Sequence, residues 1–90
     1  MSTVPQVEHD TQRHAFILNQ DGEEVRLSYR LQGDQQIDFY STFTPVALRG
    51  RGLARVVVDA GIAYAEAEQL DIIPSCSYVA KVLQRRQSAN

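Results

Sequence analysis

The chain has 90 residues and a nearly balanced charge, with 9 lysines and arginines against 11 acidic residues. A chain of this length has room for one small domain with a single hydrophobic core. The charge balance argues against a general nucleic-acid-binding protein, because such a protein carries a broad basic face. The single cysteine excludes an intramolecular disulfide and favours a reducing, cytoplasmic setting.

The hydropathy pattern gives no sign of export or of a membrane span. The N-terminus lacks the basic start and apolar run of a signal peptide, and no stretch approaches the roughly 20 apolar residues of a membrane helix. We therefore expect a soluble cytoplasmic domain over residues 1–90, at most partly ordered in residues 1–10. We expect it to be monomeric or weakly dimeric, without a membrane or nucleic-acid partner.

The first half of the chain is typical of three antiparallel strands joined by tight turns. A short apolar run lies within residues 13–19, and Asp21-Gly22 is a strong turn signal. Residues 24–32 and 36–43 then alternate apolar and polar side chains, with Gly33-Asp34 as the turn between them. In the third strand the alternation places four side chains on one face: Ile37, Phe39, Ser41 and Phe43.

The second half predicts a helix, a strand and a second helix. The helix covers about residues 53–69, and its interior Gly61 suggests close packing against a strand. A short strand over residues 70–74 follows, and a last helix covers residues 77–86. A right-handed crossover makes this strand parallel to the third one. The predicted fold is α+β, with two helices and a four-stranded mixed sheet that combines an antiparallel meander and one parallel strand.

The run Leu48-Arg49-Gly50-Arg51-Gly52-Leu53-Ala54 stands between the third strand and the long helix. The first turn of a helix leaves backbone N–H groups unpaired and carries partial positive charge. Glycines let an anion approach the backbone where a Cβ atom would block it. Arginines 49, 51 and 55 add charge, and no acidic residue occurs in residues 39–58 to cancel it. The pattern favours a pyrophosphate site; the alternative is a plain turn with solvated arginines.

A family resemblance favours the pyrophosphate site. Arg49-x-x-Gly52-x-Ala54 matches the Arg/Gln-x-x-Gly-x-Gly/Ala signature of the GCN5-related N-acetyltransferase (GNAT) superfamily, which cradles the pyrophosphate of acetyl-coenzyme A. Residues 44–54 and 72–79 look closer still to its small YjdJ-type branch, as do Val7-Glu8-His9-Asp10 and Phe16-Ile17-Leu18. The likeness covers nearly the whole chain.

The resemblance implies the three-layer-like α/β core of that superfamily and an acetyl-CoA site. In the superfamily the two parallel strands splay apart, and the pantetheine arm of acetyl-CoA inserts between them. No metal is implied. The positions that the resemblance assigns to the cofactor are Phe43, Thr44, Arg49, Gly50, Arg51, Gly52, Leu53 and Ala54.

Cys76 and Tyr78 are the candidate catalytic residues, because the last strand brings the thioester near them. A cysteine at a helix N-terminus can have a lowered pKa, and it would accept the acetyl group or assist departure of the CoA thiolate. A buried, inert thiol is the alternative. Tyr78 would give a proton to the leaving thiolate, as a tyrosine does in many larger relatives, or would pack in the core. His9 and His14 are expected to be exposed, and Asp38 would be a base only if its face lined the cleft.

The sequence departs from the small relatives at Ser41-Thr42, where they often carry histidine before threonine. Serine cannot take a proton at neutral pH, which places direct deprotonation of an amine by that position in doubt. We expect a minimal N-acetyltransferase that transfers acetyl from acetyl-CoA to an amine, such as a peptide or protein amine. A non-catalytic CoA-binding sensor or interaction module is the second reading, and a structural protein without a nucleotide is the third.

Overall fold

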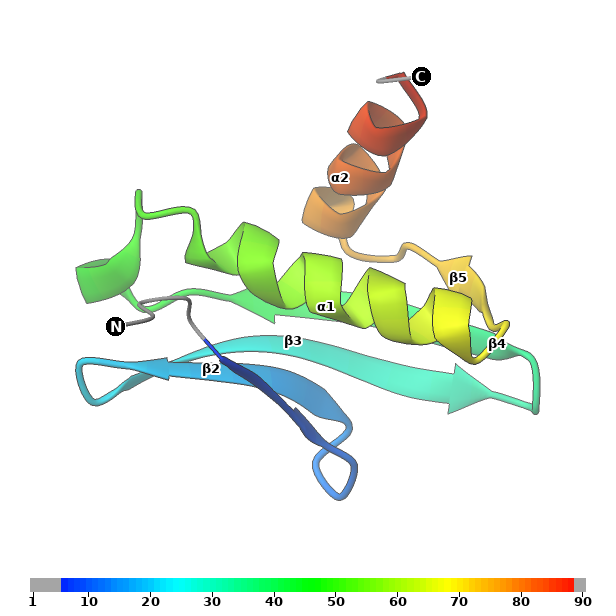
Figure 1. Ribbon diagram of the computed structural model, residues 1–90, viewed down its shortest axis with the longest axis horizontal. Helices are drawn as coiled ribbons and strands as arrows, with labels where there is room; N and C mark the ends of the chain where they lie inside the picture. The colour runs from blue at the N-terminus through cyan, green and yellow to red at the C-terminus, as the bar shows by residue number, and fades with distance from the viewer. Residues whose placement is uncertain (1–5, 89–90) are drawn as a thin grey trace.

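The chain folds as a single twisted sheet with one helix lying across it and a second helix at its end (Figure 1). The computed structural model describes residues 6–88; residues 1–5, part of the segment predicted to be partly ordered, lie outside this range. Between β4 and α1 the chain makes one short 3-10 turn. The elements are β1 (Val7–Asp10), β2 (Ala15–Gln20), β3 (Glu23–Gln32), β4 (Gln36–Phe43), the 3-10 turn (Val46–Leu48), α1 (Leu53–Ala67), β5 (Asp71–Ile73) and α2 (Ser77–Ser88).

The sheet has five strands in the order β1-β2-β3-β4-β5. The strands from β1 to β4 are antiparallel neighbours, and β5 is parallel to β4. The α+β class, the two helices and the parallel last strand are therefore confirmed, whereas the prediction of four strands is wrong. The strand that was missed is β1, which pairs with β2 from Val7 opposite Leu18 to Asp10 opposite Ala15.

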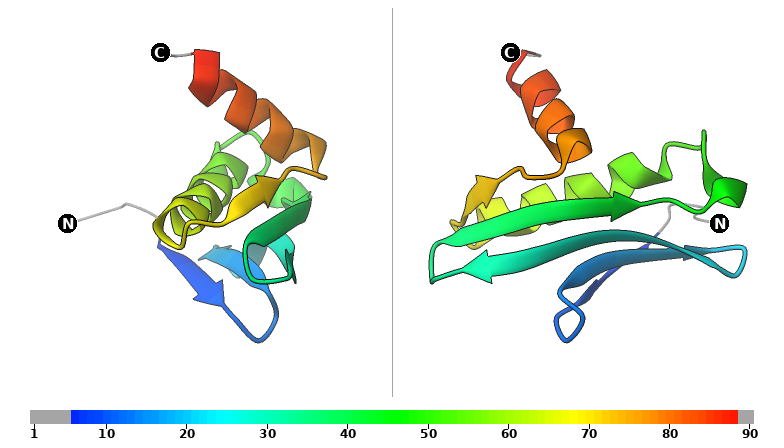
Figure 2. Two further views of the ribbon diagram at one scale, coloured as in Figure 1. Left: turned by 90° about the vertical axis from the view of Figure 1, so that its right-hand side faces the viewer. Right: turned by 180° about the vertical axis from the view of Figure 1, so that it is seen from behind.

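Helix α1 packs on one face of the sheet and buries most of the core. Val57, Val58 and Ile62 on the helix and Leu27 and Phe39 on the sheet are at most 1 % exposed. At Gly61 a Cβ atom would lie 2.6 Å from Leu27 Cδ2, so the predicted close approach of helix and strand is confirmed. Seen from behind, β3 and β4 face the viewer, α1 lies behind β4, and α2 rises above the sheet (Figure 2). Within residues 6–88 this second face carries no helix.

A bulge in β4 changes which side chains share a face. Ser28 pairs with Ser41 but the next residue, Tyr29, pairs with Phe39, so Tyr40 is an extra residue in β4. A bulge of one residue shifts the alternation beyond it by one position. The prediction that Ser41 and Phe43 share the face of Phe39 is therefore wrong. Phe43 stands opposite Arg26 on the face without helices.

Strands β4 and β5 pair only over a short length and then separate. Their ladder runs from Gln36 opposite Asp71 to Asp38 opposite Ile73. One more bond follows, in which the Cys76 N–H donates to the Phe39 carbonyl at 2.9 Å. Strand β4 continues to Phe43, whereas the segment that follows β5 turns away into α2. The two parallel strands therefore splay apart beyond Phe39, as the resemblance implied.

The helix ends differ slightly from the predicted ones. Helix α1 ends at Ala67 rather than Gln69, because Gln69 takes a left-handed φ of 57°. The Leu70 N–H then donates to the Ala65 carbonyl at 2.8 Å and closes the helix end. Helix α2 extends to Ser88, two residues beyond the prediction. No helix among the described residues is long and apolar enough to cross a membrane.

Candidate active site

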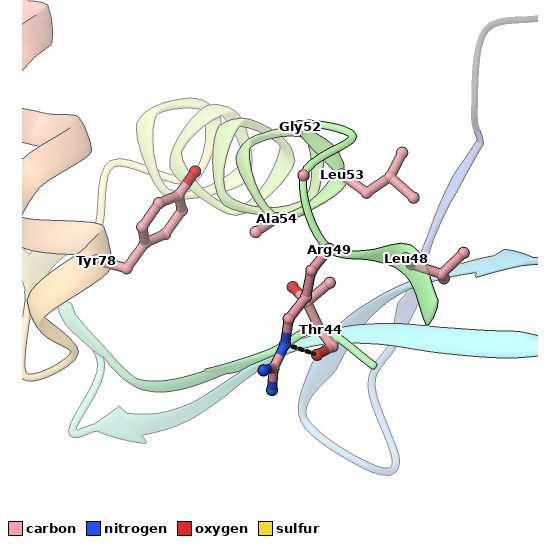
Figure 3. Close-up of a pocket in the computed structure, with 8 residues that line it drawn as sticks. Thr44, Leu48, Arg49, Gly52, Leu53, Ala54 and Tyr78 are labelled. Atoms are coloured by element: carbon pink, nitrogen blue, oxygen red, sulfur yellow. Dashed lines mark hydrogen bonds between the residues drawn. The ribbon is translucent and has the colours of Figure 1, made fainter. Parts of the chain in front are cut away.

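A groove runs from the start of α1 to the splayed end of β4. It consists of two adjoining cavities of about 190 and 340 Å³ that share Thr44, Arg49, Ala54 and Tyr78 as lining residues. Figure 3 shows Thr44 and Arg49 on one side, Ala54 on the first turn of α1, and Tyr78 reaching in from α2. The segment from the end of β4 to the start of α1 therefore meets the distant helix α2 around one open groove.

The glycine loop leaves room for a ligand at the start of α1. Gly50 and Gly52 have φ angles of 83° and 76°, a conformation that side chains rarely adopt. A Cβ atom at either position would have no heavy atom within 4 Å, so the backbone borders open space. Gly52 is the N-cap of α1, and no side chain caps the helix there. The first-turn N–H groups and the helix dipole are therefore not matched by a side-chain acceptor at the cap.

The arginines of this segment have different partners. Arg49 lines the groove, and its Nε donates to the Thr44 carbonyl at 3.1 Å (Figure 3). Arg51 points away to the β2–β3 turn, where it lies 3.1 Å from Asp21. No acidic residue is close to the arginines in the sequence, but the fold brings Asp21 next to Arg51. The expectation that their charge is not offset is therefore wrong. Arg55 pairs with Asp59 at 3.0 Å, as their spacing of four allowed.

Cys76 immediately precedes α2 and forms hydrogen bonds with β4. Its sulfur lies 3.3 Å from the Thr42 hydroxyl, and the side chain is partly buried. Partial burial raises the pKa of the thiol, but hydrogen bonds from Thr42 and from the backbone N–H groups of Val79 and Tyr78 outweigh it. The pKa of Cys76 therefore lies below its ordinary value of 9.0. Cys76 does not itself line either cavity, but Thr42 lines the larger one.

The structure brings most of the predicted cofactor residues to the groove, with Arg51 as the exception. Phe43 lines only the larger cavity, and its ring also lies 5.4 Å below the guanidinium carbon of Arg26. Tyr78 lines both cavities. The predicted positions that line at least one cavity are Phe43, Thr44, Arg49, Gly50, Gly52, Leu53, Ala54 and Tyr78.

The histidines lie elsewhere. His9 is not exposed as predicted: its Nε2 lies 2.6 Å from the Tyr29 hydroxyl, and its ring stacks on Phe16 and meets Tyr64 edge-on. Burial lowers the pKa of His9. The nearby Asp10 raises this pKa, and His14 lowers it further, so that the net shift is downward. His14 is exposed, as predicted.

Asp38 and Ser41 both lie outside the groove. Asp38 is directed to the face without helices and pairs with Arg30 at 3.5 Å. Ser41 faces the same side, opposite Ser28. Two residues that line the groove, Thr42 and Leu48, were not among the predicted site residues. Thr42 lies on β4. It reaches the groove only because of the bulge at Tyr40, and nothing in the sequence signals that bulge.

Comparison with known proteins agrees with this geometry. Residues 15–90 match the family model described as GCN5-related N-acetyl-transferase. The chain is 32% identical over 81 residues to Protein NATD1 of Gallus gallus, covering 88% of this chain and 74% of the relative. It is 31% identical over 80 residues to Protein NATD1 of Homo sapiens, covering 87% and 71% of the two chains. The chain therefore belongs to the GCN5-related N-acetyltransferase family.

Proposed function

We propose that this protein is a minimal N-acetyltransferase that binds acetyl-CoA in the groove between α1, β4 and α2. The observation that carries the proposal is the continuity of the groove. It joins an uncapped helix N-terminus with two positive-φ glycines to the point where β4 leaves β5. A pyrophosphate fits the first feature, and an extended amide-bearing arm fits a strand that has lost its neighbour.

In this proposal each part of the groove has one task. Gly50, Gly52 and the first-turn N–H groups bind the pyrophosphate, and Arg49 leaves the Thr44 carbonyl to pair with it. The freed backbone of Phe43 and Thr44 bonds to the pantetheine arm. This extended pose directs the thioester toward Thr42 at the inner end of the groove, whose hydroxyl lies 3.3 Å from the Cys76 sulfur.

The reaction is acetyl transfer to an amine. The amine nitrogen forms a bond to the acetyl carbon, the carbon–sulfur bond breaks, and the CoA thiolate leaves. The Tyr78 hydroxyl or the Cys76 thiol gives the thiolate its proton, and the proton lost from the amine goes to water. Small relatives often carry a histidine at the position of Ser41. Because serine replaces it here, we assign no histidine side chain as the base that deprotonates the amine.

Product mass spectrometry tests this function. The protein is incubated with acetyl-CoA and a panel of amines, and acetylated products are identified directly. Tyr78→Phe keeps the ring that lines the groove and removes the proton, so kcat should fall about tenfold or more while acetyl-CoA binding is retained. A full rate in both Tyr78→Phe and Cys76→Ser would contradict the assigned proton donors.

A CoA-binding module without turnover is the second candidate. The observation that favours it is the position of the histidines: both described histidines lie outside the groove, and Ser41 faces away from it. Tight binding of acetyl-CoA with no acetylated product across the amine panel would select this function over the enzyme.

A further inference from the structure

A separate cavity lies at the end of the molecule away from the glycine loop, between the β3–β4 turn and the C-terminal end of α1 (Figure 1). Its volume is about 320 Å³, and we call it the distal cavity. None of its lining residues borders the groove at the start of α1. The β3–β4 side and the α1 side contribute three residues each: Leu31, Gly33 and Asp34, and Tyr64, Glu68 and Leu70.

The distal cavity has apolar walls that the fold leaves in contact with solvent. Leu31 lies on the same face of β3 as Leu27 and Tyr29, because side chains alternate along a strand. Those two are at most 3% exposed, whereas Leu31 is 50% exposed. On the other wall, the Tyr64 ring is held in place by His9, which it meets edge-on with ring centres 4.5 Å apart. An exposed leucine and a fixed aromatic ring form a surface on which an apolar side chain packs.

Both charged side chains that line the distal cavity are acidic. Within residues 6–88, neither Asp34 nor Glu68 takes part in an ion pair, and both are exposed. Asp34 also borders an adjoining cavity of about 360 Å³, whose other charged lining residue is Asp71. Acidic side chains elsewhere in the fold pair with arginines, and these are Asp21, Glu24, Asp38, Asp59 and Glu66.

The end of α1 adds to the negative charge of the distal cavity. Glu68 is the C-cap of α1, and the last turn of this helix holds no basic residue. The C-terminus of a helix carries partial negative charge and favours a cation beside it. The helix end and the carboxylates therefore require the same charge in a ligand, and the fold supplies no cation of its own there.

We propose that the distal cavity is a docking site for a partner protein, and that it takes a segment in which an apolar side chain stands next to a lysine or an arginine. The apolar side chain packs on Leu31 and Tyr64. The stem of the basic side chain lies on Leu70, and its charge lies between Asp34 and Glu68. The apolar walls select such a segment over a cation without an apolar part, such as a polyamine.

Nuclear magnetic resonance of the full chain tests this site with short peptides whose ends are acetylated and amidated. The probe is Leu-Lys-Leu-Lys. Gly-Lys-Gly-Lys keeps its charge and lacks the apolar side chains, and Leu-Gln-Leu-Gln keeps the apolar side chains and lacks the charge. We expect the probe to shift the amides of Gly33, Asp34 and Glu68 and to bind about threefold or more tightly than either control. No shift of these amides, or equal binding of either control, would overturn the proposal.

Four substitutions at exposed positions define the site further. Asp34→Asn and Glu68→Gln each remove one carboxylate and should each weaken probe binding about twofold or more. Leu31→Thr removes the apolar wall while keeping a residue that suits a strand, and it should also weaken binding. Glu23→Gln removes the same charge outside the cavity and should bind the probe as the wild type does. Unchanged binding in any of the first three variants, or equal weakening in Glu23→Gln, would contradict the site.

Acetyl-CoA affinity, measured by calorimetry in the same variants, separates this inference from the proposed function. We expect it to stay unchanged, because none of the substituted residues lines the groove. Specific probe binding by a protein that binds no acetyl-CoA would remove the proposed function and support the docking site. Normal acetyl-CoA binding without specific probe binding would remove the docking site alone.

Discussion

The Thr42 hydroxyl lies 3.3 Å from the Cys76 sulfur and joins β4 to the start of α2 just where β4 and β5 separate. Partial burial raises the pKa of the Cys76 thiol, but hydrogen bonds from this hydroxyl and from the backbone of Thr42, Tyr78 and Val79 together lower it further. Since the thiolate is the reactive form of cysteine, one side chain on β4 tunes the chemistry of a residue on the next element.

Thr42→Val should raise the pKa of Cys76. The substitution keeps the shape of the side chain but removes the hydroxyl, which leaves burial with less opposition. Alkylation by iodoacetamide as a function of pH measures the change, because only the thiolate reacts. We expect the wild-type inflection below 9.0 and a higher inflection in Thr42→Val. Thr42→Ser is the matched control and should keep the wild-type inflection; a wild-type inflection in Thr42→Val would contradict the account.

Gly61→Ala should destabilise the fold, although alanine is the better helix former. The new Cβ atom would lie 2.6 Å from Leu27 Cδ2 and 3.1 Å from the Phe39 ring. Overpacking a core typically costs about 1–3 kcal/mol, which exceeds the helix-propensity gain of about 1 kcal/mol. Urea unfolding should therefore give a lower free energy of unfolding.

A double mutant distinguishes this clash from a backbone effect. Leu27→Val removes one methylene at the point of contact, so Gly61→Ala should cost less in that background than in the wild type. Equal costs in the two backgrounds, or a stabilised Gly61→Ala protein, would show that helix and strand are not this close.

The free energy of unfolding should decrease as the pH is lowered, because of His9. Burial lowers its pKa from 6.5, so below pH 6.5 the unfolded chain takes up a proton that the folded chain still excludes. The contribution is fully present above pH 6.5 and is lost as the pH falls through the folded pKa. His9→Gln should flatten the decline of Tm in this range. His14→Asn, at an exposed position with a φ of 52°, should keep it; an unchanged decline in His9→Gln would refute the assignment.

Local sequence patterns were sufficient for most of the fold. Alternation identified β3 and β4, and the turn signal at Asp21-Gly22 lies between two paired strands. The short polar strand β1 was missed because four residues carry little alternation. A signal was present, however: the Asp10 side chain accepts from the N–H groups of Gln12 and Arg13, and an aspartate at this spacing is typical of a tight turn.

The site was predictable only in part. The glycine pattern at residues 50–52 identified the loop, because positive φ angles and helix starts are local properties. The partners of its arginines were not predictable, since Arg51 meets Asp21 across 30 positions. The bulge at Tyr40 was equally hidden, and it decides that Thr42 rather than Ser41 faces Cys76. Contacts between residues far apart in the sequence, and the register of paired strands, cannot be predicted from alternation alone.

A matched pair of substitutions at Gly52 is the sharpest probe of the loop. Asparagine and aspartate both tolerate the left-handed conformation better than other side chains, and a Cβ atom at this position meets open space. The two side chains have nearly the same volume and differ in charge. Because an aspartate at the helix start repels a pyrophosphate, Gly52→Asp should bind acetyl-CoA about tenfold or more weakly than Gly52→Asn.

Calorimetric titration of the wild type, Gly52→Asn and Gly52→Asp with acetyl-CoA tests the central claim most directly. The account predicts one site per chain in the wild type and a loss of affinity that is larger for aspartate than for asparagine, with all three proteins equally folded. No heat of binding in the wild type at millimolar acetyl-CoA would contradict it, as would equal affinities in all three proteins, because the glycine loop would then bind no pyrophosphate.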